Sequence, residues 1–214
     1  MLLINLKYKK REVQKMRKPD VIMKIEAAWN ELSDTIDERQ KGHDRDSLAN
    51  NHFVIWEEAD IPFQIGRFLL NNQKNNKYEF HLEMNLTTKN FESYSFSDNG
   101  SLEEVKKVLK VKKSPRVDFL VDDRSNSIFP AIGEAKYFRY SIKSVSRGKR
   151  DAISDLDKDY KRLHAFIHNQ ICKYGVYFVV DHYYHRKEKE IWKKIKAKLN
   201  KIESDGIYVF TKEV

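Results

Sequence analysis

The chain has 214 residues, 40% of them hydrophobic and 12% aromatic, which suits one folded core and excludes a disordered protein. Its 41 Lys and Arg against 32 Asp and Glu give a formal charge of +9, which favours polyanionic partners. Without a run of about 18 apolar residues we expect no membrane span, and the single Cys172 excludes an internal disulfide and fits a cytoplasmic location.

Two helical segments are predicted near the start of the chain. After a basic lead-in closed by Pro19, apolar residues at helical spacing predict a helix over 21–40. Pro62 in a second segment, 47–72, either kinks that segment or sits in the first turn of a helix capped by Asp60. The apolar stripe of the second segment is Val54, Ile61, Ile65, Phe68 and Leu69.

The middle of the chain alternates between strands and helices. Alternation predicts a strand over 78–86. Ser101 and Glu104 have the spacing of a capping box at the start of a short helix, 101–110. The remaining predicted elements follow in order: strand 116–122, strand 128–138, a basic loop over 139–150, helix 152–170, strand 174–180, helix 186–203 and strand 206–210.

This order of elements indicates an α/β fold with a mixed sheet. The short turn between strands 116–122 and 128–138 makes them an antiparallel hairpin, and the later helical crossovers allow parallel pairs. We expect one domain over 46–214, preceded by a basic and helical N-terminal extension over 1–45.

The predicted hairpin carries charges among apolar residues. In "AIGEAKYF", residues 131–138, Glu134 and Lys136 share one face of a strand, and Asp118 lies in the apolar strand "VDFLV". Two carboxylates on adjacent strands make an oxygen-lined site for Mg²⁺ or Mn²⁺. A lysine beside them can orient a water or stabilise charge on a phosphate. The alternative interpretation is a cross-strand ion pair, which contributes little energy on a surface.

"SPRVDFLVDD" followed by "AIGEAKYF" resembles the PD-(D/E)xK nuclease superfamily, which includes restriction endonucleases and archaeal Holliday junction resolvases. The resemblance rests on Asp118, on the triplet 134–136 and on the helix–strand–hairpin–helix–strand order over residues 47–181. Arg116 and Val117 precede Asp118 where the motif has proline, and Pro115 lies further back. The resemblance implies a restriction-endonuclease-like α/β/α sandwich.

The resemblance also implies roles for individual residues. Asp118, Glu134 and the Ala135 carbonyl would bind Mg²⁺ or Mn²⁺, and Lys136 would act on the attacking water. Many members of the superfamily add an acidic residue from the preceding helix, for which Glu58 is the candidate. Glu57 and Asp60 are alternates for this fourth position, and Glu83 is a weaker rival.

Basic residues after the hairpin are candidate DNA contacts. They are Lys143, Arg147, Lys149 and Arg150 of the predicted loop and Lys158 of the following helix. The alternative for each is an ordinary solvated side chain.

The histidines are the other candidate metal ligands. His164 and His168 have the i, i+4 spacing of a zinc pair but lack the glutamate of HExxH, and they are predicted to be surface residues. A metal role for His182 and His185 is not expected.

The sequence therefore predicts a Mg²⁺-dependent DNA nuclease, favoured as an endonuclease over an exonuclease. One alternative is a catalytically inactive DNA-binding or assembly protein on the same fold, and another is an unrelated α/β interaction module. DNA is the expected partner, and a homodimer is left open.

If residues 143–150 contact phosphates, the double variant Lys149→Ala, Arg150→Ala should bind all duplex sequences more weakly. The slope of log affinity against log salt should fall by about 0.9 for each lost contact, because fewer counterions are released. Titrations of labelled duplex DNA at several salt concentrations measure this slope. An unchanged slope would show that this segment makes no phosphate contact.

Overall fold

The computed structural model describes residues 18–40, 58–71, 77–87, 94, 100–125, 127–138, 145–181 and 189–213, with only the backbone described for 40, 145–153, 189–192 and 204. The helices are α1 (Asp20–Gln40), α2 (Asp60–Asn71), α4 (Ser101–Leu109), α5 (Val145–His168) and α7 (Lys189–Ser204). The strands are β1 (Glu79–Asn85), β2 (Arg116–Asp122), β3 (Phe129–Phe138), β4 (Cys172–Asp181) and β5 (Ile207–Glu213).

The five strands form one mixed sheet in the order β1-β2-β3-β4-β5. β1, β2 and β3 pair antiparallel, whereas β3, β4 and β5 pair parallel through the crossover helices α5 and α7. The predicted hairpin and the predicted mixed sheet are both confirmed. β5 continues three residues beyond the predicted strand and ends at Glu213.

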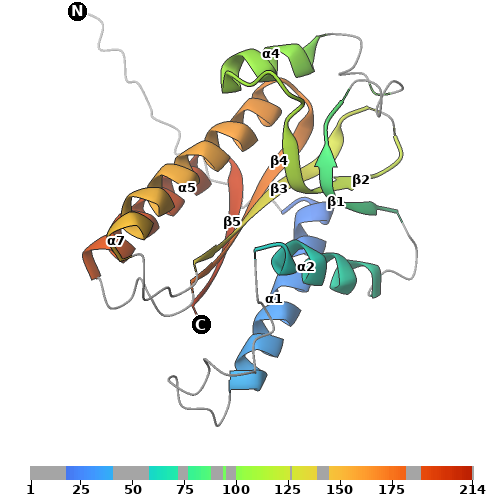
Figure 1. Cartoon of the computed structure of the whole chain (residues 1–214). Coiled ribbons are helices and arrows are strands. Elements are labelled where there is room, and N and C mark those ends of the chain that lie inside the picture. The colour runs from blue at the N-terminus through green and yellow to red at the C-terminus, as the bar shows by residue number, and fades with distance from the viewer. Residues whose placement is uncertain are drawn as a thin grey trace, which may run out of the picture.

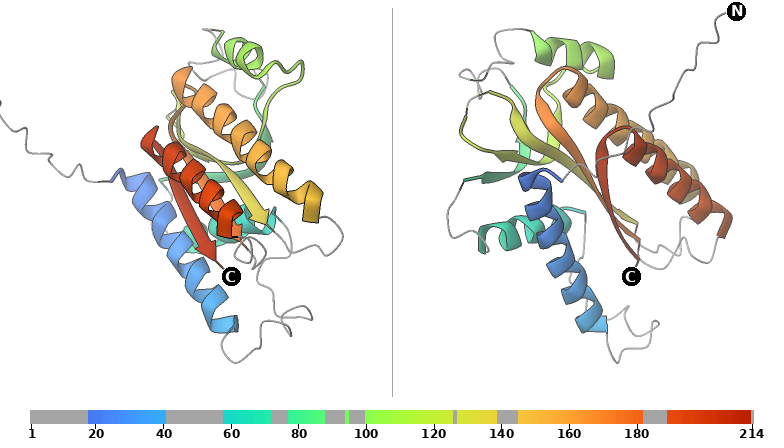
Figure 2. Two further views of the ribbon diagram at one scale, coloured as in Figure 1. Left: turned by 90° about the vertical axis from the view of Figure 1, so that its left-hand side faces the viewer. Right: turned by 180° about the vertical axis from the view of Figure 1, so that it is seen from behind.

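Helices cover both faces of the sheet (Figure 1; Figure 2). α4, α5 and α7 pack on one face, and α1 and α2 pack on the other. The predicted helix 21–40 is therefore present as α1. Its residues Ile22 and Leu32 are fully buried in the core that α1 and α2 form with the sheet. The predicted domain boundary at 45/46 lies outside the described residues. Among the residues described, no helix combines the length and the apolar character needed to cross a bilayer.

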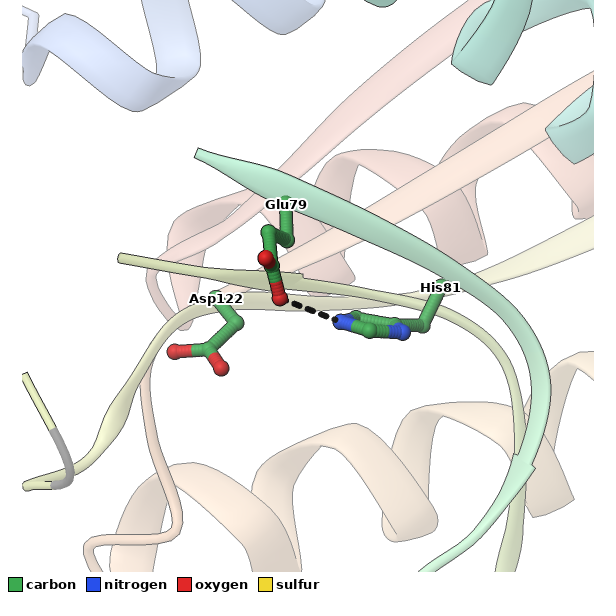
Figure 3. A group of neighbouring side chains, drawn as sticks. All are labelled: Glu79, His81 and Asp122. Carbon is green, nitrogen blue, oxygen red and sulfur yellow. Dashed lines mark ion pairs between the residues drawn. The ribbon is translucent and has the colours of Figure 1, made fainter. Parts of the chain in front are cut away.

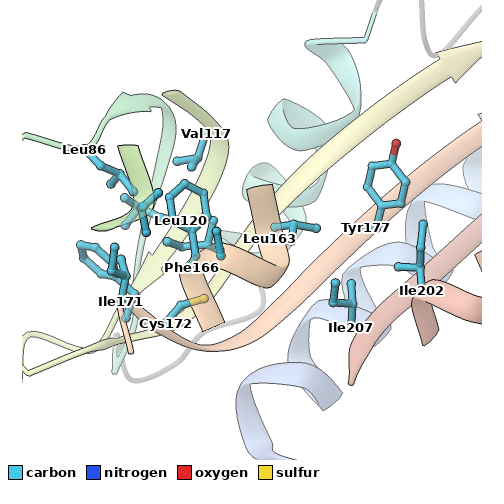
Figure 4. Packing of buried hydrophobic residues seen from close by; sticks show 14 of the residues in the cluster. Leu86, Val117, Leu120, Leu163, Phe166, Ile171, Cys172, Tyr177, Ile202 and Ile207 are labelled. Carbon is cyan, nitrogen blue, oxygen red and sulfur yellow. The ribbon is translucent and has the colours of Figure 1, made fainter. Parts of the chain in front are cut away.

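The core between the sheet and α4, α5 and α7 is built from aliphatic side chains and a few rings (Figure 4). Leu163 and Phe166 of α5 and Leu120 of β2 are fully buried there. Cys172 lies in the same core, where burial raises the pKa of its thiol. It is thus a small buried apolar residue.

The opposite core contains a row of stacked aromatic rings. Phe119 of β2 stacks on Phe80 of β1 with ring centroids 5.4 Å apart, and on Phe178 of β4 with centroids 5.3 Å apart. Phe178 in turn stacks on Trp29 of α1 at 5.2 Å. The row passes over β3 because its residue there is Gly133, where a Cβ would lie 1.8 Å from a ring carbon of Phe119.

Two local predictions were wrong. Ser101 does not cap α4: Gly100, with φ 74°, is the N-cap, and its carbonyl accepts the N–H groups of Glu103 and Glu104. Ser101 is instead the first helical residue and is buried. Glycine adopts the left-handed backbone conformation at little cost, and this conformation at Gly100 directs the chain into α4.

The second wrong prediction is the basic loop. Residues 145–150 form the first turns of α5, so Arg147, Lys149 and Arg150 are helical, whereas Lys143 lies outside the described residues. Lys and Arg are good helix formers, and the helix extends through them once its later turns are packed on the sheet.

Gly133→Ala should destabilise the protein by more than an ordinary overpacking substitution, which costs about 1–3 kcal/mol, because Phe119 would have to leave the ring row. Urea denaturation measures the free energy of unfolding. The cost should be smaller in a Phe119→Leu background, because the residue opposite position 133 is then no longer a ring. Equal costs in the two backgrounds would contradict the assigned contact.

Candidate active site

Asp118 lies where the β1–β2–β3 ribbon twists. Leu82 of β1 and its cross-strand partner Phe119 pack in the core between the sheet and α1 and α2, called the α1/α2 core. Met84, two residues after Leu82, packs instead in the core on the opposite face of the sheet. Between Leu82 and Met84, Glu83 has a φ of 50°, which changes the direction of the strand. The half-buried Asp118 lies opposite this turn, and its carboxylate accepts a hydrogen bond of 2.8 Å from the Ala135 N–H of β3.

Glu134 is the most buried acid of the hairpin, at 1% exposure. The register that pairs Phe119 with Gly133 places Glu134 opposite Asp118. Its carboxylate accepts a hydrogen bond of 2.8 Å from the Arg162 guanidinium, which α5 brings across this face of the sheet. Ala135 points to the other face, where it is fully buried in the α1/α2 core.

Lys136 connects two acids that are far apart in sequence. Its ammonium lies 2.8 Å from Glu58, in the turn before α2, and 3.3 Å from Asp159 of α5. Glu58 also accepts a hydrogen bond of 3.4 Å from the Tyr137 N–H. Asp159 is 4% exposed and accepts a hydrogen bond from the Tyr177 hydroxyl of β4. The charges of the hairpin are therefore paired with groups from the turn before α2 and from α5, and β4 supplies a hydroxyl to Asp159.

Burial is the largest cause of the pKa shifts of three acids in the cluster, Glu134, Glu58 and Asp159. It raises the pKa of Glu134 well above the usual range, the nearby Asp118 raises it further, and Arg162 opposes the shift. Burial also raises the pKa of Glu58 and of Asp159, while Lys136 opposes both shifts. A metal ion would offset the same penalty, because it stabilises the ionised carboxylates.

Burial alone would lower the pKa of Lys136, but Asp159 and Glu58 outweigh it and raise that pKa. Lys136 is therefore a cation in this arrangement, and it cannot serve as a base. It can hold a water molecule or stabilise negative charge on a substrate.

An open cleft of about 590 Å³ borders this cluster. Glu58, Asp118 and Arg162 line it, together with part of α2 and the segment 111–116 between α4 and β2. The same segment supplies cationic side chains to the wall, Lys113 and Arg116. Glu134 lies behind Arg162, with a side chain only 2% exposed. A ligand in the cleft would thus meet acidic and basic groups together.

The structure brings the predicted residues Asp118, Glu134, Lys136 and Glu58 together in one cluster. The helix expected to carry Glu58 begins only at Asp60, so Glu58 reaches the cluster from a turn. Glu57 lies outside the described residues, and Asp60 lies in the first turn of α2.

Other candidates lie away from this cluster. Glu83 borders the cleft and is paired with Arg116. Lys158 is exposed and paired with Asp155, three residues earlier on the same helix. His164 and His168 are exposed, as predicted, and His182 and His185 lie outside the described residues.

Sequence reasoning missed Asp159, Arg162 and Tyr177. On α5, Leu156, Leu163 and Phe166 are fully buried. Asp159 falls between Leu156 and Leu163 on this buried face, so an acidic residue within an apolar stripe was the available signal.

A second group of potential ligands lies on β1 and β2. Ligand atoms of Glu79, His81 and Asp122 lie within 4.8 Å of one another (Figure 3). Each carboxylate already has partners, because Glu79 pairs with Arg124 and Asp122 accepts a hydrogen bond from the buried Tyr94 hydroxyl. This group can be explained as a hydrogen-bonded end of the sheet.

Comparisons with known proteins found no family model, no curated protein and no solved structure that matches this chain. The geometry of the site therefore carries the functional argument.

The raised pKa of Glu134 predicts a specific pH dependence of stability. Folding holds a proton on Glu134 above pH 4.5, the ordinary pKa of a glutamate, so its contribution is complete below that pH and is lost as pH rises towards the folded pKa. In metal-free buffer, the unfolding free energy of the wild type minus that of Glu134→Gln should fall between about pH 5 and about pH 8. The fall should be about 1.4 kcal/mol for each pH unit that separates the folded pKa from the unfolded one.

Urea denaturation at these two pH values measures that difference. Glu38→Gln, at an exposed position of α1, is the control for the loss of one glutamate carboxylate. A constant difference for Glu134→Gln would contradict the raised pKa.

Proposed function

We propose that this protein is a Mg²⁺- or Mn²⁺-dependent phosphodiesterase that cleaves DNA, acting as an endonuclease. One observation carries the proposal: Asp118 and Glu58 line a cleft that also has cationic walls, and the buried Glu134 and the half-buried Lys136 lie directly behind them. Acidic groups with a nearby lysine are what metal-assisted phosphate hydrolysis requires.

The fold supports the same proposal. The sheet has an antiparallel meander of three strands followed by two parallel strands reached through helices. This order is compatible with the restriction-endonuclease-like sandwich that the resemblance implies. The resemblance to the PD-(D/E)xK superfamily in "VDFLVDD" and "GEAKYF" supports it at the level of residues. Phe119 pairs with Gly133, which puts their neighbours Asp118 and Glu134 side by side on the paired strands, and this placement supports the proposal.

The donor set fits a hard divalent cation. Carboxylate oxygens of Asp118 and Glu134 and the carbonyl of Ala135 are the type of ligand that Mg²⁺ and Mn²⁺ prefer. When bound, the ion would lower the pKa of a water molecule and polarise the phosphate. Lys136 would hold the attacking water and oppose the charge that develops on the phosphate. Glu58 keeps the Lys136 ammonium in place.

Phosphate groups outside the reacting position would meet the cationic wall of the cleft. Lys113 and Arg116 supply this wall, and the ion pair between Arg116 and Glu83 holds the Arg116 guanidinium at the rim. The overall charge of +9 adds a sequence-independent attraction to DNA.

A second candidate function is a catalytically inactive nucleic-acid-binding or assembly protein on the same fold. The observation that favours it is that Glu134 and Lys136 already have protein partners, Arg162, Glu58 and Asp159. Measured metal affinity separates the two candidates. An inactive protein with closed ion pairs would bind Mn²⁺ only weakly or not at all.

The metal ligands are tested by calorimetric titration of Mn²⁺ into the wild type and Asp118→Asn. The wild type should bind one ion, through oxygen atoms at about 2.1 Å if the ion is Mg²⁺. Asp118→Asn should bind at least about tenfold more weakly, because a charged ligand is replaced by a neutral one. Equal affinities would remove Asp118 from the site.

The role of Lys136 is tested by Lys136→Met, which keeps the apolar stem of the side chain. Cleavage of supercoiled and linear DNA with Mg²⁺ should fall at least about a thousandfold, while DNA binding persists, because a contact with the reacting group is lost. Lys212→Met is a matched control: Lys212 has a side chain 15% exposed, against 18% for Lys136, and also pairs with an aspartate of another element. It should cleave normally. Equal loss of activity in both variants would indicate a purely structural ion pair.

A further inference from the structure

Arg162 separates Glu134 from the cleft. Its guanidinium donates to the Glu134 carboxylate at 2.8 Å and lies 3.7 Å from Asp159. The Arg162 side chain is 31% exposed and lines the cleft, whereas that of Glu134 is 2% exposed. Any ion that reaches Glu134 from the cleft must therefore first displace Arg162.

The charge of the cluster leaves room for one divalent cation. Its four carboxylates belong to Glu58, Asp118, Glu134 and Asp159, and its two cations to Lys136 and Arg162. The formal charge is −2 when all four acids are ionised, a state that a bound metal ion would favour. Lys136 is held from both sides by Glu58 and Asp159. Arg162 is the more exposed of the two cations, so it can leave the cluster at lower cost.

We propose that Arg162 occupies the metal's position against Glu134 in the metal-free protein and moves into the cleft when the ion binds, where it contacts a phosphate of the nucleic acid. This inference rests on the proposed function. An ion of charge +2 next to the guanidinium would repel it and would take the same carboxylate oxygens. Within the cleft, the planar guanidinium can bind two phosphate oxygens at once.

The arrangement couples metal binding to DNA binding. Metal-free protein holds Arg162 on Glu134, so part of the metal's binding free energy is lost in breaking that contact. A phosphate that binds the released guanidinium recovers part of this loss, so each ligand should raise the affinity for the other. The ion would then bind more tightly when DNA is present, and Arg162 would be a positioning residue for Glu134 before it becomes a substrate contact.

The test compares the wild type with Arg162→Ala and Arg162→Gln, and Lys161→Ala serves as the control. Lys161 is exposed on the same helix, so its variant removes the same charge one residue away. Without DNA, both Arg162 variants should bind Mn²⁺ about tenfold more tightly by calorimetry, because a charge-assisted hydrogen bond no longer competes. Lys161→Ala should match the wild type.

The coupling is measured in a Lys136→Met background, with Mn²⁺ titrated in the presence and absence of a short DNA duplex. Duplex DNA should tighten Mn²⁺ binding at least about threefold when Arg162 is present and leave it unchanged in Arg162→Gln. Melting temperatures in chelator should fall for Arg162→Ala, because Glu134 loses its partner, and Mn²⁺ should then raise them more than in the wild type. Arg162→Gln retains an amide donor for Glu134 and supplies the comparison if the alanine variant does not fold.

Unchanged or weaker Mn²⁺ binding by both Arg162 variants would overturn the inference and leave the proposed function standing, with Arg162 only holding Glu134 in position. Absence of Mn²⁺ binding and of cleavage in the wild type would overturn both. Tighter metal binding with lost coupling to DNA is the result that the inference requires.

Discussion

The contact of Phe119 with Gly133 sets the register on which the site depends. Because the ring occupies the space of a missing side chain, the hairpin of β2 and β3 is held with these two residues opposite each other. Asp118 and Glu134 are their neighbours and are therefore opposite each other too. A slip of one residue would send each side chain to the wrong face of the sheet. A packing contact in one core thus positions two acids at the other face.

The cluster shows how a protein can keep charges inside an apolar fold. Glu134 and Asp159 are nearly inaccessible to solvent, yet both have cationic or hydroxyl partners from other elements. An unpaired buried charge costs several kcal/mol, so each partner removes a large penalty. Well-packed apolar side chains would stabilise a fold as well or better, so a buried network of charges is not explained by stability alone.

The three layers have different roles in this arrangement. The strands fix the acids and Lys136, whereas α5 supplies the movable cation Arg162 and the buried acid Asp159. Glu58 comes from the turn before α2 and pairs with Lys136. A site assembled from separate elements can change its pairings when a ligand binds without unfolding any of them, which is what the exchange of Arg162 for a metal ion would require.

The sequence by itself determined the elements and the hairpin charges. Sequence patterns located β1, β2 and β3 to within a residue, and Asp118, Glu134 and Lys136 stood out because they interrupt apolar strands. The starts of two helices were predicted wrongly from local sequence. The N-cap of α4 is Gly100, in the left-handed region, and not the predicted serine. Residues 145–150, predicted as part of a basic loop, form the first turns of α5.

Only the tertiary structure decided which groups meet the hairpin. Arg162 and Asp159 lie more than twenty residues from Glu134 and Lys136 in sequence, and Glu58 lies 78 residues from Lys136. No local periodicity encodes such pairs, because they depend on how α5 and the start of α2 dock against the sheet. That docking follows from the burial of Leu156, Leu163 and Phe166, a non-local effect of the whole core.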